Sequence, residues 1–304
     1  MDNPSDSAAA RGRGRVSALG WMAAASLGAV FAGVVAAACL LRFDLDRLLF
    51  PRTPPLAEAR GVTEAFRLPG HDGAAMVVRR SVRGLAGSTR GCVVWFPGRH
   101  GGEDETTREF FDELEETGLV VYAVAYPGQD GAPGPARLDD VQAAAATAVA
   151  TVVARCGRDR TVVAGRSLGA TVAAHAAGST PCAGLLLGSA SPSLSAGIRG
   201  ALRDHWFLRP LALLPVERIV ARDYSLAEAL PAGLHVVVFQ GDADTQTPLA
   251  ALRPDAGGPE RLAIIEVAGG THADTLARAR ATMVSATLGM IRGSEEATAA
   301  GEDH

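Results

Sequence analysis

Apolar runs without alternation are the feature that most restricts how this chain can fold. Val-Val-Tyr-Ala-Val-Ala at 120–125 and Ala-Gly-Leu-Leu-Leu-Gly at 183–188 do not alternate apolar and polar residues. A strand of this composition is covered on both faces, which is typical of parallel sheets. The strands that we predict are 64–69, 74–82, 92–96, 119–125, 161–165, 183–188, 234–240 and 262–267.

Helical patterns fall between most of these strands. We predict helices over residues 104–116, 138–155, 168–178, 247–253 and 274–290. Strands and helices that alternate along a chain build a mostly parallel sheet wrapped by helices. The first two predicted strands have no helix between them, so we expect an antiparallel pair at that edge. The sequence therefore predicts an α/β domain over residues 61–292, with a mostly parallel eight-stranded sheet.

Two stretches lie outside this alternation. Residues 190–233 contain no predicted strand and are expected to form a short lid. The last residues, 293–304, are acidic and are predicted to be a disordered tail.

A long uncharged segment precedes the domain. Residues 16–41 carry no charge, and residues 16–42 are predicted to be a transmembrane helix. At about 1.5 Å per residue, such a helix spans a hydrocarbon core of ~30 Å with some tilt. The alternatives are a buried helix, a cleavable signal peptide, whose apolar region runs only ~7–15 residues, and a lipoprotein signal ending at Cys39.

Basic residues flank the segment on both sides, so the charge balance across it is nearly even. Three arginines lie in the short tail 1–15, and three more follow the segment among aspartates. We expect a single-pass membrane protein with a cytoplasmic N-terminus and an extracytoplasmic domain. Residues 43–60 contain prolines and are predicted to be a neck linker.

The stretch Gly165-Arg166-Ser167-Leu168-Gly169 stands where a predicted strand ends and a predicted helix begins. A serine in such a sharp turn adopts a strained backbone, and small neighbours let strand and helix approach. The start of the helix directs its amides and its positive dipole end at the serine. Gly-x-Ser-x-Gly alone is a weak signal, but the strand before it and the helix after it indicate a nucleophile.

A serine hydroxyl needs a base and an orienting acid to act as a nucleophile. His272 follows the last predicted strand in a glycine-rich loop and is our candidate base. Asp244 follows the preceding strand and is our candidate acid, with Asp242 in reserve. The order Ser167, Asp244, His272 is the order of a known triad type on open parallel sheets.

An oxyanion that forms on such a serine needs two backbone donors. The N–H of Leu168, directly after the serine, is one candidate. The N–H of Arg99, in the glycine-rich loop that follows strand 92–96, is the other. The alternative for this loop is a plain glycine turn.

Composition excludes several other chemistries. All 29 Lys and Arg residues are arginine, which removes Schiff-base chemistry and the lysine of phosphate-binding loops. A net charge of −4 gives no signal for nucleic acid as a partner. The four cysteines lack Cys-x-x-Cys spacing, so we expect no metal site and no cofactor.

Five motifs together make the chain, from about 61 to 290, resemble the α/β-hydrolase superfamily. They are Phe-Pro-Gly-Arg-His-Gly-Gly (96–102), Ala-Tyr-Pro-Gly-Gln-Asp-Gly (125–131), Gly-Arg-Ser-Leu-Gly (165–169), Gln-Gly-Asp-Ala-Asp-x-x-Thr-Pro (240–248) and Gly-Gly-Thr-His (269–272). With the N-terminal anchor and the short lid, the chain is similar to the membrane-anchored subgroup of protein depalmitoylase-like serine hydrolases. One departure from the pattern is Pro97-Gly98, where relatives usually have His-Gly before the oxyanion residue.

The resemblance implies ester or thioester hydrolysis through an acyl-enzyme formed on Ser167. The partners are then a small acyl ester or an acylated substrate, and membrane lipid around residues 16–42. The alternatives are a catalytically silent binding protein, and the same triad used for acyl transfer or perhydrolysis. Arg166 could bind a substrate anion or pair with a nearby acid. Trp206, Phe207 and Leu208 in the lid could line an acyl pocket, touch lipid or pack over the sheet.

Two cysteines are expected at the amino-terminal edge of the sheet. Cys156 ends a predicted helix and Cys182 precedes strand 183–188. Successive strands in this fold class are usually neighbours, so the two thiols could form a disulfide. The alternative is two unrelated core residues. A disulfide persists only in an exported domain.

Overall fold

The computed structural model describes residues 6–55, 62–81, 89–102, 104–230, 232–253 and 262–302. The chain divides into two compact units, Met1–Asp44 and Leu45–His304. The first unit contains helix α1 (Asp6–Phe43). Its segment Gly20–Phe43 is 24 residues long with a hydropathy of 2.2, enough to cross a membrane by length and composition, although a signal sequence would meet the same criterion.

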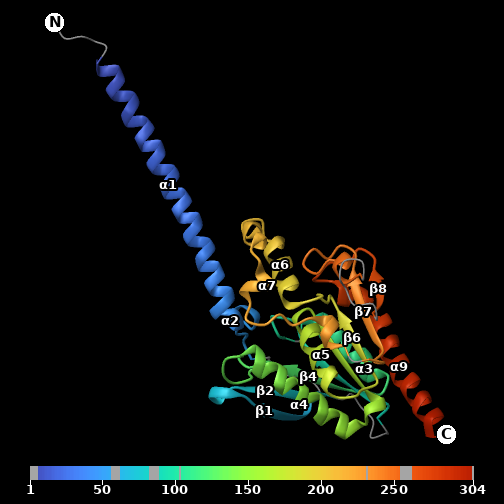
Figure 1. Ribbon diagram of the computed structural model, residues 1–304. Helices are drawn as coiled ribbons and strands as arrows, with labels where there is room; N and C mark the ends of the chain where they lie inside the picture. Colours follow the sequence, from blue (N-terminus) through green and yellow to red (C-terminus); the bar gives the residue numbers. More distant parts are fainter. Residues whose placement is uncertain are drawn as a thin grey trace. The chain divides into compact units, whose positions relative to one another are not determined.

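The second unit is built on one eight-stranded sheet (Figure 1). Its strands are β1 (Val62–Pro69), β2 (Ala75–Ser81), β3 (Gly91–Phe96), β4 (Leu119–Ala125), β5 (Thr161–Arg166), β6 (Gly184–Gly188), β7 (Val236–Gly241) and β8 (Ala263–Val267). Their order is β1-β2-β4-β3-β5-β6-β7-β8. β2 pairs antiparallel with β1 and β4, and the pairs from β4 through β8 are parallel. The predicted α/β class, with its antiparallel edge pair, is confirmed.

Long helices cover both faces of this sheet. The helical segments of the unit are α2 (Leu45–Leu49), η1 (His71–Gly73), α3 (Glu105–Glu116), α4 (Leu138–Cys156), η2 (Arg158–Arg160), α5 (Leu168–Ser179), α6 (Leu194–Asp204), η3 (Arg209–Leu213), α7 (Val216–Ile219), α8 (Leu226–Ala229), η4 (Leu249–Leu252) and α9 (Thr275–Glu302). α4 and α5 pack on one face, and α3 and α9 pack on the other.

Strand β3 illustrates why the central runs lack alternation. Cys92, Val94 and Phe96 point into the core under α4 and α5, whereas Val93 and Trp95 point into the core under α3 and α9. All five side chains are buried. A strand between two cores needs apolar residues at every position, which is the pattern that the sequence shows.

The carboxyl-terminal helix extends further than the sequence predicts. Residues 293–304 are expected to be a disordered tail, but α9 continues to Glu302. Glu and Ala have high helix propensity, so the acidic stretch can prolong a helix whose earlier turns already pack against the sheet. Ser294 Oγ donates to Asp159 Oδ1 at 3.1 Å, which fastens this extension to the η2 turn.

The residues just after α1 are packed into the second unit. Leu49 and Phe50 are buried in the core under α4 and α5. The Phe50 ring contacts that of Tyr126 edge-on at 5.2 Å between centroids. Asp46 Oδ1 accepts the N–H of Leu138 at 2.9 Å and so caps the start of α4. Within the predicted neck 43–60, residues 45–50 therefore belong to the fold of the domain.

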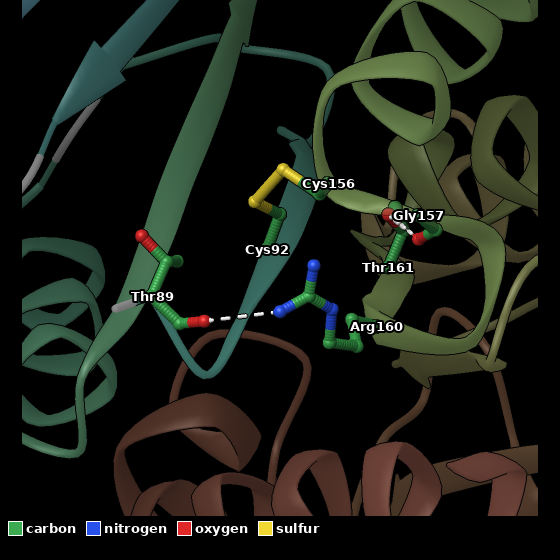
Figure 2. Close-up of a disulfide and its surroundings, with 6 residues drawn as sticks. All are labelled: Thr89, Cys92, Cys156, Gly157, Arg160 and Thr161. Atoms are coloured by element: carbon green, nitrogen blue, oxygen red, sulfur yellow. Dashed lines mark hydrogen bonds between the residues drawn. A yellow bond between two sulfur atoms is a disulfide. The ribbon is translucent and has the colours of Figure 1, made fainter.

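A disulfide joins Cys92 to Cys156, with 6.2 Å between the Cα atoms (Figure 2). The pairing of Cys156 with Cys182, one of the two alternatives that the sequence left open, does not form. β3 lies between β4 and β5 in the sheet, so α4, which connects β4 to β5, must cross β3. Its last residue, Cys156, therefore ends over Cys92 near the start of β3. Cys182 is a free thiol that donates to Gly184 O, and burial raises its pKa to about 11.

Candidate active site

Ser167 stands in the sharp turn between β5 and α5. Its backbone has φ 55° and ψ −121°, in the region that side chains other than glycine rarely adopt. The turn is tight because its flanking glycines are in close contact. A Cβ on Gly165 would collide with the carbonyl of Gly169, and a Cβ on Gly169 would collide with the carbonyls of Phe96 and Pro97. Glycine therefore stands at the two positions where the close approach of neighbouring backbone leaves no room for a Cβ atom.

The structure brings Ser167, His272 and Asp244 together at the carboxyl ends of three parallel strands. Ser167 Oγ lies 2.9 Å from His272 Nε2. His272 Nδ1 lies 2.9 Å from Asp244 Oδ2. With the proton of neutral His272 on Nδ1, this nitrogen donates to Asp244 and Nε2 is free to accept from Ser167. This arrangement can remove a proton from the serine as it attacks an electrophile.

Asp244 is buried and held by donors from its own loop and from the end of β7. The backbone N–H groups of Gln246 and Thr247 donate to Oδ1 at 3.0 and 2.8 Å. Thr247 Oγ1 donates to Oδ2 at 2.7 Å, and Gln240 Nε2 donates to the same oxygen at 3.2 Å. Burial on its own raises the pKa of Asp244, but the hydrogen bonds of His272 and Thr247 outweigh it and lower the pKa below 3.8. The carboxylate is therefore ionised at neutral pH.

Between the two aspartates of this loop, the structure places Asp244 at the histidine. Asp242, the reserve candidate, is exposed, and its backbone N–H bonds to Val267 O at 3.3 Å. Sequence analysis did not single out the supporting residues Thr247 and Gln240. The signal for Thr247 was present, since Asp-x-x-Thr is the spacing at which an aspartate accepts from the backbone and hydroxyl three residues on.

The loop that carries His272 is fastened from two directions. The Arg166 guanidinium donates to the carbonyl oxygens of His272 and Ala273, both at 2.9 Å. Asp274 accepts from the N–H and the hydroxyl of Thr271, both at 2.6 Å. Arg166 also lies 3.8 Å from Asp104, on the turn before α3. Its direct contacts are therefore with the histidine loop and with an acid.

The two expected oxyanion donors lie in segments that border Ser167. Leu168 is the first residue of α5, so its N–H has no carbonyl one turn earlier in the helix. Arg99 lies in a turn closed by the N–H of Gly101 and the carbonyl of Gly98 at 3.0 Å. This turn adjoins the serine, because a Cβ on Gly98 would lie 3.6 Å from Ser167 Cβ. The loop with Pro97-Gly98 thus lies beside the nucleophile.

Residues in the loop after β4 hold the turn that contains Arg99 through hydrogen bonds. Gln129 is fully buried and its Nε2 donates to Arg99 O at 2.8 Å. Asp130 Oδ2 accepts the N–H of Gly102 at 2.7 Å, and Tyr126 O–H donates to Pro97 O at 3.0 Å. These three residues belong to the motif at 125–131, to which the sequence alone assigned no role.

In the described part of the chain, no group of three or more His, Cys, Asp or Glu is placed to hold a metal ion.

Comparison with known proteins gives matches at the level of structure. No protein-family model and no curated protein matches this sequence. Among solved structures, brefeldin A esterase, a bacterial homologue of human hormone-sensitive lipase, is 17% identical with a TM-score of 0.52, and the match covers 86% of each chain. Est1E from Butyrivibrio proteoclasticus with bound ferulic acid is 16% identical with a TM-score of 0.53, over 73% of this chain and 97% of that one.

A third neighbour is esterase 2 of Thermogutta terrifontis, phosphoramylated by tabun. It is 18% identical with a TM-score of 0.52, over 77% of this chain and 97% of that one. At such identities the likeness concerns architecture. The order of the strands, the helices on both faces and these neighbours together show that the chain has the α/β-hydrolase fold.

Proposed function

We propose that this protein is a membrane-anchored serine hydrolase that cleaves a carboxylic ester or thioester through an acyl-enzyme. The observation that carries the proposal is the continuous hydrogen-bonded path from Ser167 through His272 to the ionised Asp244. A binding protein has no physical need for these three groups in line at the end of a strained turn. Neighbours of the same fold include esterases, one of which is phosphoramylated by tabun.

In the proposed reaction, Ser167 Oγ bonds to the carbonyl carbon of the substrate while His272 Nε2 takes the hydroxyl proton. The carbonyl oxygen becomes an oxyanion, which accepts hydrogen bonds from the N–H groups of Leu168 and Arg99. Asp244 stabilises the imidazolium and keeps the ring oriented without taking the proton. His272 then protonates the leaving alcohol or thiol, and the bond from the acyl carbon to that group breaks.

Water completes the cycle along the same path. His272 takes a proton from the water as its oxygen attacks the acyl-enzyme, and the second tetrahedral intermediate uses the same two N–H donors. The proton then returns to Ser167 Oγ as the carboxylic acid leaves. An alcohol or peroxide in place of water would give acyl transfer or perhydrolysis at the same site.

Labelling with a fluorophosphonate probe tests the proposal on the full chain. We expect the wild type to be labelled and to hydrolyse acyl esters or thioesters of graded chain length. Ser167→Ala and His272→Ala should each lose turnover and labelling, because they remove parts of one chemical unit. Ser285→Ala, which removes an exposed hydroxyl on α9, is the matched control and should behave as wild type. A folded wild type that is neither labelled nor active would refute the proposal in favour of a silent binding protein.

We also propose that α1 anchors the protein in a membrane, with the N-terminus in the cytoplasm and the domain outside. Support comes from the apolar segment Gly20–Phe43 and from the Cys92–Cys156 disulfide, since disulfides persist in oxidising compartments. The disulfide closes a loop with a sequence separation of 64, worth about 4 kcal/mol in the chain-entropy model.

Peptide mapping of the membrane-bound protein under thiol-blocking conditions checks this orientation. We expect a linked pair of peptides containing Cys92 and Cys156, with Cys182 recovered as a free thiol. Two alkylated thiols at Cys92 and Cys156 would place the domain in a reducing compartment and overturn the proposed orientation.

A further inference from the structure

The tip of the lid exposes large apolar side chains to solvent. Trp206 is 79% exposed, Phe207 60% and Leu213 85%. The rings of Trp206 and Phe207 contact each other edge-on at 5.9 Å between centroids, and Leu213 ends η3 a few residues further along the same segment. We call Trp206, Phe207 and Leu213 the lid tip. In the described part of the second unit, the other exposed large apolar residues are Leu48 and Ile265, at only 37% and 36%.

The lid tip is fixed beside the candidate active site. Asp204, the last residue of α6, accepts from Thr245 Oγ1 at 2.8 Å and from Gln246 Nε2 at 2.9 Å, both in the loop that carries Asp244. α6 also touches this loop directly, since a Cβ on Gly200 would collide with the carbonyl of Gln246. Trp206 follows Asp204 by two residues and therefore belongs to the same edge of the sheet. In Figure 1, α6 and α7 project from that edge.

The chain enters the domain at this same edge. Gln129 Nε2 donates both to Arg99 O, in the turn beside Ser167, and to Pro51 O at 3.0 Å. Thr53 Oγ1 accepts the N–H of Asp130 at 2.9 Å. The membrane-spanning candidate ends at Phe43, so only a few residues separate its end from this attachment. The edge that carries Ser167 is therefore the edge of the domain to which the residues that follow the membrane-spanning candidate are attached.

From these placements we infer that the lid tip contacts the phospholipid bilayer in which α1 is anchored, and that the substrate is an acyl ester or thioester of an amphiphile in that bilayer. Tryptophan and phenylalanine favour the boundary between head groups and acyl chains. Arg203 and Arg209 are exposed beside the tip, where anionic head groups would attract them. The substrate part of this inference rests on the proposed hydrolase function, and the contact with lipid rests on the proposed anchor.

Tryptophan quenching in nanodiscs tests the contact with lipid. The full chain is reconstituted in phosphatidylcholine and phosphatidylglycerol, with or without acyl-brominated phosphatidylcholine. A Trp21→Phe background removes the tryptophan inside α1 and leaves Trp206 and the buried Trp95. We expect brominated lipid to quench this protein and to leave Trp21→Phe/Trp206→Phe unquenched. Absence of quenching at Trp206 would overturn the inference, and so would loss of a detergent-solubilised dimer in Trp206→Ala/Phe207→Ala, which would assign the lid tip to a second copy of the chain.

The ratio of two activities tests the substrate class. Turnover of a long-chain acyl ester embedded in the nanodisc is compared with turnover of a short soluble acyl ester. Trp206→Ala/Phe207→Ala should lower the ratio of kcat/KM values by about 10-fold or more, because two large apolar side chains no longer bind lipid. The matched control Ile265→Ala, on the edge strand β8, should leave the ratio unchanged. An unchanged ratio in the double variant would overturn the substrate assignment, whereas quenching without any turnover of either ester would refute the hydrolase function and leave the lipid contact standing.

Discussion

Two backbone segments flank Ser167, the loop with His272 and the turn with Arg99, and a different side chain supports each of them. On the histidine flank, Arg166 donates to the carbonyls of His272 and Ala273. On the other flank lies the turn with Arg99, the proposed oxyanion donor, which we call the oxyanion turn on the oxyanion flank. Gln129 donates to the carbonyl of Arg99 there. In each case one side chain fixes the backbone of a loop whose own groups face the serine.

The two supporting residues differ in origin and surroundings. Arg166 is the neighbour of Ser167 in the chain, its side chain is 18% exposed, and it lies near the exposed Asp104. Gln129 comes from a separate loop after β4, is fully buried, and donates in addition to Pro51 O. The histidine flank is thus supported from within the elbow by a partly exposed side chain. The oxyanion flank depends on a buried network that includes the residues following α1.

The difference indicates where the site is vulnerable. Water can replace a donor that is lost at an exposed position, but it cannot easily replace a donor in a sealed one. A change at the N-terminal end of the domain can therefore reach the turn with Arg99 through Gln129. The hydrogen bonds from Arg166 to the histidine loop do not involve that end of the domain. The predictions below measure each flank separately through turnover.

Asp244→Asn should have the largest effect in this series. An amide at this position donates to the ring nitrogen instead of accepting from it, so His272 would present a proton to Ser167 Oγ. We expect kcat to fall by about 10⁴-fold with the fold intact. Steady-state kinetics with a soluble acyl ester measure it, and Asp242→Asn is the matched control with near-normal activity. The reverse outcome, with Asp242→Asn inactive, would mean that the choice of acid is wrong.

Sequence analysis could predict the features that are local or periodic. All eight strands lie within two residues of their predicted bounds. The central strands could be recognised because a strand between two cores is a continuous apolar run. The serine turn was recognisable from its glycines, and the candidate triad from the order of loops after strands. These signals need only the residues of one segment and the general rule that parallel strands end at one edge.

Contacts between distant segments could not be predicted in this way. The disulfide partner of Cys156 depends on which strand α4 crosses, and that follows from a strand order in which β3 lies between β4 and β5. The roles of Gln129 and Arg166 depend on which carbonyls come within reach after folding. For the tail, acidity was taken to mean disorder, whereas its alanine and glutamate residues prolong α9.

Gln129→Met should have the second largest effect, on the oxyanion flank. Methionine has a similar volume but no donor, so Arg99 O loses its buried partner and the turn can move. We expect kcat to fall by about 10- to 100-fold while KM changes little, because the turn acts on the transition state. The affinity for a trifluoromethyl ketone, which forms a tetrahedral adduct with the serine, should fall in parallel.

The control for Gln129 is Gln142→Met, on α4. Its amide is also buried in the described structure but has no hydrogen-bond partner there, so its loss removes no support from the turn. If both variants lost the same activity, the effect would come from packing in general. An unchanged affinity for the ketone in Gln129→Met would contradict the role of Gln129 in positioning the oxyanion turn.

Arg166→Met should have a smaller effect, on the histidine flank. Water can reach this partly exposed position and replace some of the hydrogen bonds to His272 O and Ala273 O. We expect kcat to fall by about 5-fold, with Arg166→Lys recovering part of the loss through one of the two carbonyls. Asp104→Asn, which removes only the exposed acid beside Arg166, should be indistinguishable from wild type in the same assay. A larger loss for Arg166→Met than for Gln129→Met would reverse the comparison of the two flanks.

Thr247→Val should have the smallest effect on turnover and a specific effect on stability. Thr247 Oγ1 donates to Asp244 Oδ2 at 2.7 Å and is among the groups that hold the pKa of Asp244 below 3.8 against burial. A carboxylate whose pKa is lowered by folding stabilises the folded state at pH values above the pKa of the unfolded chain, about 3.9. This stabilisation is lost as the pH falls through the lower pKa of the folded state.

Removing the hydroxyl brings the folded pKa of Asp244 closer to the unfolded value, so part of this stabilisation disappears. At pH 7 we expect the free energy of unfolding of Thr247→Val to lie about 1 kcal/mol below that of wild type. The gap should narrow as the pH is lowered through about 4, because both proteins then lose the ionised carboxylate. Urea unfolding at a series of pH values measures it, and Thr247→Ser, which keeps the donor, should follow the wild-type curve. A gap of constant size down to about pH 2 would assign the contribution of the Thr247 side chain to packing, and the support of Asp244 would then come from Gln240, His272 and the backbone N–H groups of Gln246 and Thr247.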